Sequence, residues 1–174
     1  MNTWWLAIDR QCTSYLELKH RKVVAQGWPD LDDLKTLCPL VANPTNSGLF
    51  QQVVGELEMI VYRSSKSPNI MWNLMRIQTD DLVIGIEGTV VKGICQMAKN
   101  GWESYHYDYR GVYSYAQTVG FPVEWIDWDP IIFGFVPTPP AQSVSGIAGL
   151  VNQHQAVVDA WNKYKQTPSV IKNG

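Results

Sequence analysis

The chain of 174 residues has a formal net charge of −2, with 45% hydrophobic and 17% charged residues. This composition predicts a single globular domain and excludes a disordered chain. The low net charge excludes a protein that coats nucleic acid non-specifically through a broad basic surface, but it permits a local basic patch beside a dry pocket. The chain contains eight tryptophans and eight tyrosines. We interpret this excess as core filling combined with the aromatic surfaces that a base-stacking pocket requires.

The sequence carries no signal for membrane insertion, secretion or metal binding. No apolar run approaches the length of a membrane span, and the N-terminus lacks the pattern of a signal peptide. Cys12, Cys38 and Cys95 are odd in number and widely spaced, which predicts reduced thiols in a cytoplasmic protein. The histidines lack ligand-like spacing, so we expect neither a structural metal nor another cofactor.

The first half of the chain predicts short elements around two helices. In chain order we expect a buried strand at residues 4–8, a polar segment at 10–22 that begins as a helix, and a second strand at 23–25. A short helix at 30–37, a loop at 39–48 and two helices at 49–61 and 68–75 follow. Gly27-Trp28-Pro29 ends the second strand. Residues 49–61 have helical apolar spacing, and Ser67-Pro68 resembles a helix start.

The second half predicts strands followed by one long helix. A hairpin of two strands, at residues 81–86 and 90–97, is expected around the Glu87-Gly88 turn. Three more strands at 104–109, 119–128 and 131–136 and an amphipathic helix at 143–165 follow. Alternation over residues 104–109 places its tyrosines on one face. The count predicts an α+β fold, with a mostly antiparallel sheet that curls into a small open barrel flanked by helices. We expect residues 1–165 to form one domain and residues 166–174 to be a tail or linker.

Four short motifs resemble those of EVE and YTH domains of the PUA-like superfamily. They are Asp80-Asp81-Leu82-Val83, where glycine is usual at the Asp80 position, Lys92-Gly93-Ile94-Cys95, the tyrosine-rich residues 105–109, and Val123-Glu124-Trp125. Trp4-Trp5-Leu6 also looks like the opening strand of EVE domains. The resemblance implies a PUA-like fold and a non-catalytic module that flips a modified base of DNA into an aromatic pocket.

The same resemblance implies a cellular setting. Such domains are found beside the nucleases and NTPases of modification-dependent restriction systems of the McrBC type, so a nuclease or NTPase is the expected partner and defence the expected role. The modification remains open between 5-methylcytosine, 5-hydroxymethylcytosine and 6-methyladenine, and modified RNA is an open alternative to DNA.

A base reader needs aromatic planes and a polar group that reads the base edge. For stacking we select Trp28, Tyr105 and Tyr107, with Trp102 and Trp72 behind them. For the edge we select Asp32 or Asp33, because a carboxylate accepts a hydrogen bond from an exocyclic amine. The candidate phosphate contacts are the cations of basic or polar loops, namely Lys19, Arg21, Lys22, Arg63, Lys66 and Arg110.

Two other function classes remain open from the sequence. A metal-dependent nuclease can be built from Asp9 with Glu17-Leu18-Lys19, provided that these residues lie on a strand hairpin and converge on a metal. A protein-interaction adaptor would use the helix at residues 143–165, or an exposed tryptophan patch, as its surface. Cleavage that depends on a divalent metal would support the nuclease, and base-dependent binding without metal would support the reader.

Overall fold

The computed structural model describes residues 1–65, 68–108, 115–141 and 146–167. Its strands are β1 (Thr3–Ile8), β2 (Val24–Gln26), β3 (Leu82–Glu87), β4 (Val90–Gln96), β5 (His106–Tyr107), β6 (Gln117–Val119), β7 (Ile126–Asp127) and β8 (Gly146–Leu150). Its helices are α1 (Tyr15–Arg21), α2 (Cys38–Val41), α3 (Ser47–Tyr62), α4 (Pro68–Met75), α5 (Gly101–Ser104), α6 (Pro130–Phe133) and α7 (His154–Gln166).

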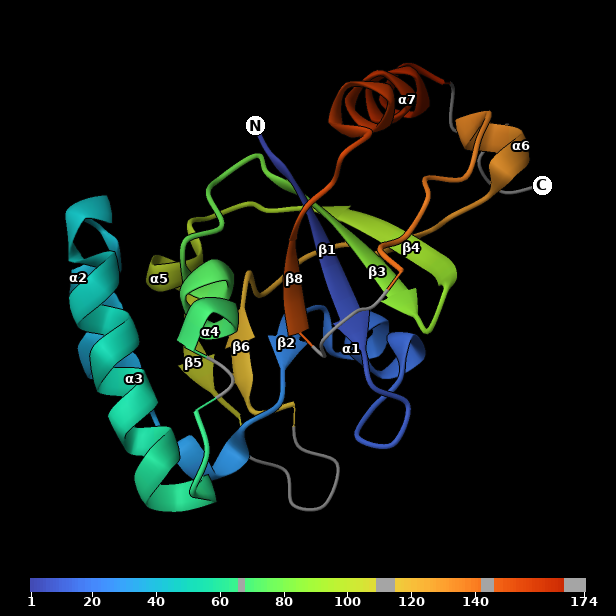
Figure 1. Cartoon of the computed structure of the whole chain (residues 1–174). Coiled ribbons are helices and arrows are strands. Elements are labelled where there is room, and N and C mark those ends of the chain that lie inside the picture. Colours follow the sequence, from blue (N-terminus) through green and yellow to red (C-terminus); the bar gives the residue numbers. More distant parts are fainter. Residues whose placement is uncertain (66–67, 109–114, 142–145, 168–174) are drawn as a thin grey trace.

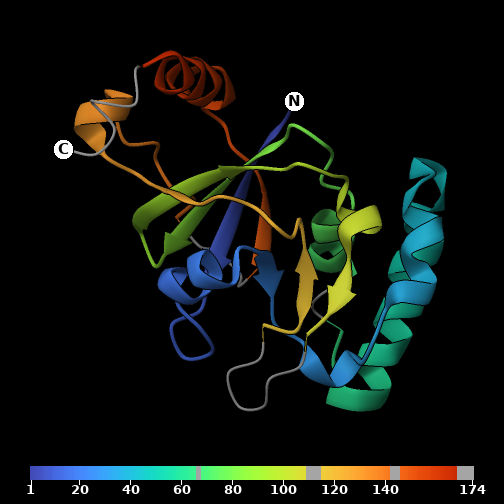
Figure 2. The same ribbon diagram turned by 180° about the vertical axis from the view of Figure 1, so that it is seen from behind.

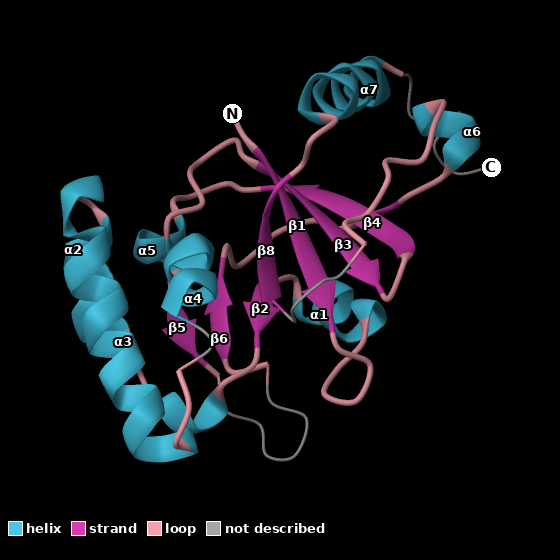
Figure 3. Ribbon diagram, viewed as in Figure 1, coloured by secondary structure: helices cyan, strands magenta, loops and turns pink. Residues whose placement is uncertain are grey.

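The strands form two sheets (Figures 1 and 3). The larger has the order β7-β4-β3-β1-β8, and the smaller has the order β2-β6-β5, whose three strands lie side by side in Figure 2. β1 pairs with β3 in parallel, and the other described pairs are antiparallel. The predicted α+β class and mostly antiparallel pairing are therefore confirmed. The described strands do not close into the predicted small barrel, because they hydrogen-bond in two separate sheets.

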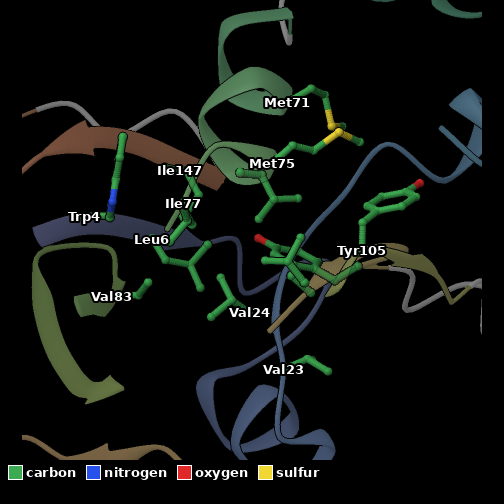
Figure 4. Close-up of a cluster of buried hydrophobic side chains, with 14 of the residues drawn as sticks. Trp4, Leu6, Val23, Val24, Met71, Met75, Ile77, Val83, Tyr105 and Ile147 are labelled. Atoms are coloured by element: carbon green, nitrogen blue, oxygen red, sulfur yellow. The ribbon is translucent and has the colours of Figure 1, made fainter. Parts of the chain in front are cut away.

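The larger sheet has a hydrophobic core on each face. Along β1, Trp4 and Leu6 enter the first core, while Trp5 and Ala7 enter the second. The first core also receives side chains from α3 and from α4 and β2, of which Met71, Met75 and Val24 are seen in Figure 4. The second lies under α6 and α7 (Figure 1). A strand that is buried on both faces has few polar positions, which explains the continuous apolar run at the start of the chain.

The second core contains a row of stacked rings. The ring of Phe133 stacks on Trp128 at 4.4 Å and on Tyr164 at 5.4 Å between centroids. Tyr164 in turn stacks on Trp161 at 5.6 Å. These rings join α6 and α7, and the Trp128 indole N–H donates to the Phe135 carbonyl at 2.8 Å. Such contacts account for several of the tryptophans as core residues.

Elements with strong local patterns form as predicted. α4 spans the expected Pro68–Met75, and α3, β1 and the β3–β4 hairpin lie within a few residues of their predicted bounds. Residues 10–22 do not begin as a helix as expected, because α1 occupies only the second part of the segment, after the N-cap Ser14, which accepts a hydrogen bond from the Glu17 amide at 3.2 Å. The predicted strand at 104–109 is reduced to the two residues of β5.

The strand predicted at residues 131–136 is wrong, because the chain forms helix α6 there. Asp129 caps the helix by accepting from the Ile131 amide at 2.8 Å, and Pro130 occupies the first turn. Gly134 ends the helix with φ +81°. These capping residues outweigh the β-branched and aromatic composition of the segment.

The long helix predicted at residues 143–165 is also wrong over its first part. Residues 146–150 form β8, which pairs antiparallel with β1, and α7 begins only at His154. Gly146 and Gly149 have φ values of +102° and +141°. Other residues rarely adopt these angles, and glycine is a poor helix former. The segment therefore pairs with β1 as an edge strand of the larger sheet and does not contribute to the apolar face of a helix.

The helix predicted at residues 30–37 is replaced by two 3-10 turns, Pro29–Leu31 and Lys35–Leu37. The loop predicted at 39–48 contains α2 and a further 3-10 turn. Of the strand predicted at 119–128, only Val119 and β7 are in strands. Among the described residues, no helix is long and apolar enough to cross a lipid bilayer. The domain boundary at residue 165 stays a prediction, since residues 168–174 lie outside the described part.

Candidate nucleic-acid interface

The backbone around Trp28 departs from ordinary geometry. Trp28 follows β2 with φ 59° and ψ 53°, and Asp32 has φ 60° and ψ −164°. A left-handed backbone costs a residue with a Cβ roughly 1–2 kcal/mol. Such conformations persist only where the surrounding structure holds them, and they concentrate at binding sites. We call residues 27–34 the Trp28 turn.

One buried side chain clamps the Trp28 turn from β6. The Gln117 side-chain amide donates to the carbonyl oxygens of Trp28 and Asp32, both at 3.1 Å. Its own oxygen accepts from the Tyr105 hydroxyl at 2.6 Å, and that hydroxyl accepts from the Leu34 amide at 2.9 Å. Gln117 is fully buried, so these hydrogen bonds are shielded from water. The clamp fixes both ends of the turn.

Two further tyrosines hold the same turn. The Tyr107 hydroxyl donates to the Pro29 carbonyl at 2.7 Å, and the Tyr62 hydroxyl accepts from the Asp30 amide at 3.0 Å. Burial raises the pKa of the Tyr62 hydroxyl to about 12. Burial also raises the pKa of Tyr105. These hydroxyls therefore stay protonated throughout the neutral range, and the turn keeps its geometry there.

The end of β1 lies beside the same region. The hydroxyl of Tyr115, which precedes β6, accepts from the Asp9 amide at 2.7 Å. Because β6 runs antiparallel to β2, the start of β6 lies next to the chain that leaves β2 toward Trp28. Asp9 and Trp28 are thus brought to the same end of the molecule, although they are distant in the sequence.

The predicted stacking residues divide into different environments. Trp28 and Tyr107 are half-buried, and Trp28 packs against the edge of the first core. Tyr105 is only 5% exposed and belongs to that core (Figure 4). It therefore supports the turn through its hydroxyl and offers no stacking surface, and its predicted role is corrected. The alternation over 104–109 correctly placed Tyr105 and Tyr107 on one face, because both hydroxyls reach the Trp28 turn.

The predicted edge-reading carboxylates lie at the surface of the Trp28 turn. Asp33 is exposed, and its carboxylate accepts from the Lys35 amide at 2.9 Å. Asp32 is exposed and contributes its carbonyl to the clamp. The Asp32 carboxylate has no hydrogen-bond partner among the described residues. Asp32 is therefore the better placed of the two for a ligand.

Trp72 and Trp102 lie elsewhere, in what we call the tryptophan pocket. This cavity of about 240 Å³ lies among β1, α2, α4 and α5, and its lining comprises Asn2, Trp4, Val41, Ala42, Pro44, Trp72, Arg76, Gln78, Trp102 and Leu150. Trp28 does not line it. Trp72 is 5% exposed and packs on Phe50 at 5.4 Å between ring centroids. The sequence predicted one aromatic pocket, but its residues are divided between the Trp28 turn and the tryptophan pocket.

Two of the predicted phosphate contacts are occupied by carboxylates. Arg21 is 8% exposed and donates to Asp108 at 3.0 Å, and Lys19 pairs with Asp127 at 2.8 Å. The role of Arg21 is corrected, because a buried and paired guanidinium does not reach a phosphate.

Of the other predicted phosphate contacts, two are exposed and two lie outside the described residues. Lys22 and Arg63 are exposed and make no ion pair with another described residue. Lys66 and Arg110 lie outside the described residues, so their predicted roles stay predictions. Of the four predicted phosphate contacts in the described part of the chain, Lys22 and Arg63 are therefore the two without an ion pair to a described residue.

The nuclease alternative does not have the geometry that it requires. Glu17 and Lys19 lie on helix α1, not on a strand hairpin with Asp9. The described residues contain no group of three or more His, Cys, Asp or Glu side chains that could hold a metal ion. The adaptor alternative also loses its exposed tryptophan patch, because none of the eight tryptophans is exposed.

Sequence reasoning missed the residues that organise the two places. Gln117 is a polar residue within a short buried strand, which is the one signal that could have singled it out. Arg76 was missed because it follows a helix without any basic neighbour. Its guanidinium lies over the Trp4 ring at 4.9 Å, a contact between residues that are distant in the sequence.

No family model matches the chain, and no curated protein matches it. Among solved structures, the chain is similar to the YTH domain of the Zygosaccharomyces rouxii MRB1 protein, crystallised in complex with N6-methyladenosine RNA. The identity is 10% and the TM-score 0.38, over 97% of this chain and 91% of that chain. A TM-score of this size does not establish a shared fold, so the function proposed below rests on this chain's own residues.

Proposed function

We propose that the chain is a non-catalytic module that reads a modified base in DNA, with Trp28 as its stacking surface. The observation that supports this proposal is the clamped backbone of the Trp28 turn. Four side chains hold this strained turn, those of Gln117, Tyr105, Tyr107 and Tyr62. The left-handed backbone and the partly exposed indole of Trp28 both cost free energy, which binding of a ligand would explain. A preorganised aromatic plane is what a flipped base needs, because stacking must recover the free energy of unstacking.

The polar group of the proposed site is the Asp32 carboxylate. A carboxylate accepts from the exocyclic amine of cytosine or adenine, and Asp32 is four residues from Trp28 in the same clamped turn. Asp30 and Asp33 add negative charge there, which disfavours close approach of phosphates. We therefore expect the base, rather than the backbone, to enter the turn, with Lys22 as a peripheral phosphate contact.

In this proposal, cleavage or translocation is performed by another protein or domain of a modification-dependent restriction system, a nuclease or an NTPase. The module supplies specificity alone and uses no metal or cofactor. A cleavage assay with Mg²⁺ tests this part, because turnover by the isolated chain would contradict a purely reading role.

The test is fluorescence-polarisation binding at fixed salt without metal. Matched duplexes carry unmodified cytosine and adenine, 5-methylcytosine, 5-hydroxymethylcytosine or 6-methyladenine, and matched single-stranded RNAs carry adenine or N6-methyladenine. We expect preference for one modified strand. Trp28→Ala should weaken that binding roughly tenfold to a hundredfold, because one stacked base contributes roughly 1–3 kcal/mol.

Trp28→Phe is the matched control, since it keeps a smaller aromatic plane and should retain most of the preference. Thermal unfolding of both variants checks that the fold is intact. Equal affinity for all modified and unmodified strands, or binding that Trp28→Ala leaves unchanged, would refute the reader and favour a protein-binding adaptor.

A further inference from the structure

The tryptophan pocket carries chemistry that the proposed reader does not use. Its cavity of about 240 Å³ is smaller than the roughly 300–1,000 Å³ typical of sites for drug-sized ligands. It therefore suits one ring system, with any larger substituent at its rim, where Asn2, Arg76 and Gln78 are exposed. Trp102 on α5 is half-buried and provides an aromatic wall, whereas Trp72 on α4 lines the pocket but is only 5% exposed. The last turn of α3 contacts the Trp28 turn, and the tryptophan pocket lies toward the other end of α3 (Figure 1).

The polar groups of this pocket are mostly unpartnered donors. The indole N–H groups of Trp72 and Trp102 have no hydrogen-bond partner among the described residues, whereas the Trp4 N–H donates to Asp81 at 2.8 Å. The side-chain amides of Asn2 and Gln78 are likewise without a partner in the described part of the chain. Amides of this kind read the edge of a heterocyclic base.

The pocket also contains an unpaired positive charge. Arg76 forms no ion pair with a described residue, and its guanidinium lies over the Trp4 ring at 4.9 Å. Partial burial lowers the pKa of Arg76, while nearby Asp81 raises it. The Asp81 carboxylate is occupied, since it accepts from the backbone N–H groups of Asn2 and Gln78 and from the Trp4 indole N–H. Arg76 is exposed at the rim of the pocket, where its guanidinium can form charge-assisted hydrogen bonds to a ligand anion.

We propose that the tryptophan pocket is a second binding site, which takes a nucleotide by stacking its base on Trp102, reading the base edge with Asn2 and Gln78, and holding its phosphate at Arg76. The nucleotide is either a free nucleoside 5′-phosphate or the phosphorylated 5′ end of a strand, because both offer the same ring and anion. An aromatic wall, two amides and one cation match these three parts of a nucleotide.

The test is isothermal titration of the intact chain with the four nucleoside 5′-monophosphates and the four unphosphorylated nucleosides. Arg76→Gln should weaken nucleotide binding about tenfold or more, since charge-assisted hydrogen bonds are the strong ones, and should change nucleoside binding little. Trp102→Ala should weaken both. Short strands with and without a 5′-phosphate then distinguish a strand end from a free nucleotide.

Trp28→Ala is the matched control and should leave nucleotide binding unchanged. If Trp28→Ala abolishes binding while Arg76→Gln and Trp102→Ala do not, the nucleotide occupies the Trp28 turn and the second site is refuted. Absence of saturable binding up to about 1 mM, which corresponds to roughly 4 kcal/mol, also refutes it. Neither result affects the test of the reader, which uses modified strands and Trp28 variants.

Discussion

Replacing Gln117 by methionine is expected to destabilise the protein by about 2–4 kcal/mol and to abolish preference for a modified base. Methionine has a similar length and volume but donates no hydrogen bond, so the carbonyls of Trp28 and Asp32 lose their shared donor. Each unsatisfied buried polar group costs roughly 1–3 kcal/mol. For a chain of this size, the midpoint of thermal unfolding should fall by about 4–16 °C.

The loss of binding has a separate cause from the loss of stability. Without Gln117, the carbonyls of Trp28 and Asp32 are no longer fixed, and the remaining hydrogen bonds of Tyr107 and Tyr62 hold only Pro29 and Asp30, so the left-handed angles of Trp28 and Asp32 can relax. Binding is measured well below the unfolding midpoint of the variant, so that only folded protein is compared.

Thr118→Val is the matched control for this variant. Thr118 is the next residue of β6, is also fully buried, and donates to the His106 carbonyl at 2.7 Å. Its replacement removes one hydrogen bond outside the Trp28 turn, so about 1 kcal/mol of stability should be lost and base preference kept. Equal loss of preference in both variants would show that general destabilisation, not the clamp, is responsible.

Replacing Asp81 by alanine should destabilise the protein by at least about 3 kcal/mol. Its carboxylate is fully buried and accepts three hydrogen bonds, from the backbone N–H groups of Asn2 and Gln78 and from the Trp4 indole N–H. These donors tie the start of β1 to the turn before β3. All three would be left without their acceptor, and the variant should unfold at lower denaturant concentration without a large change in m-value.

Asp80→Asn provides the comparison for Asp81→Ala. Asp80 is the preceding residue and is exposed, and among the described residues its carboxylate accepts a hydrogen bond only from the Gln96 side chain, at 3.3 Å. Its left-handed φ of 68° is one that asparagine adopts readily. We expect its free energy of unfolding to stay within about 0.5 kcal/mol of the parent, so that its unfolding midpoint changes little. A similar midpoint for Asp81→Ala would show that the three donors find other partners.

Local patterns predicted the elements whose signals are local. The helical spacing of α3, the Ser-Pro start of α4 and the paired apolar runs of β3 and β4 lie within single segments, and the structure confirms them. The errors occur where one or two residues override a longer pattern. Gly146 and Gly149 convert part of an expected helix into β8, and Asp129 with Gly134 converts an expected strand into α6.

The candidate site was predictable only in part, because its contacts are long-range. Trp28 could be selected from its position between glycine and proline at a strand end. Which face of the tyrosine strand is covered could not be read from alternation alone, so Tyr105 was assigned to stacking although it is in the core. The clamp by Gln117 joins residues 89 and 85 positions apart, and no periodicity of the sequence reports such a contact.

The division of the tryptophans between the two faces of the larger sheet has a consequence for spectroscopy. Trp5, Trp128 and Trp161 belong to the second core, and Trp128 and Trp161 are joined there by stacked rings. Closely stacked rings couple their electronic transitions, so this row should dominate the near-ultraviolet circular dichroism. Both proposed binding places lie on the other side of the sheet. The dichroism therefore serves as an internal reference for the docking of α6 and α7, while a ligand should change the fluorescence of Trp28 or of the three tryptophans that line the tryptophan pocket.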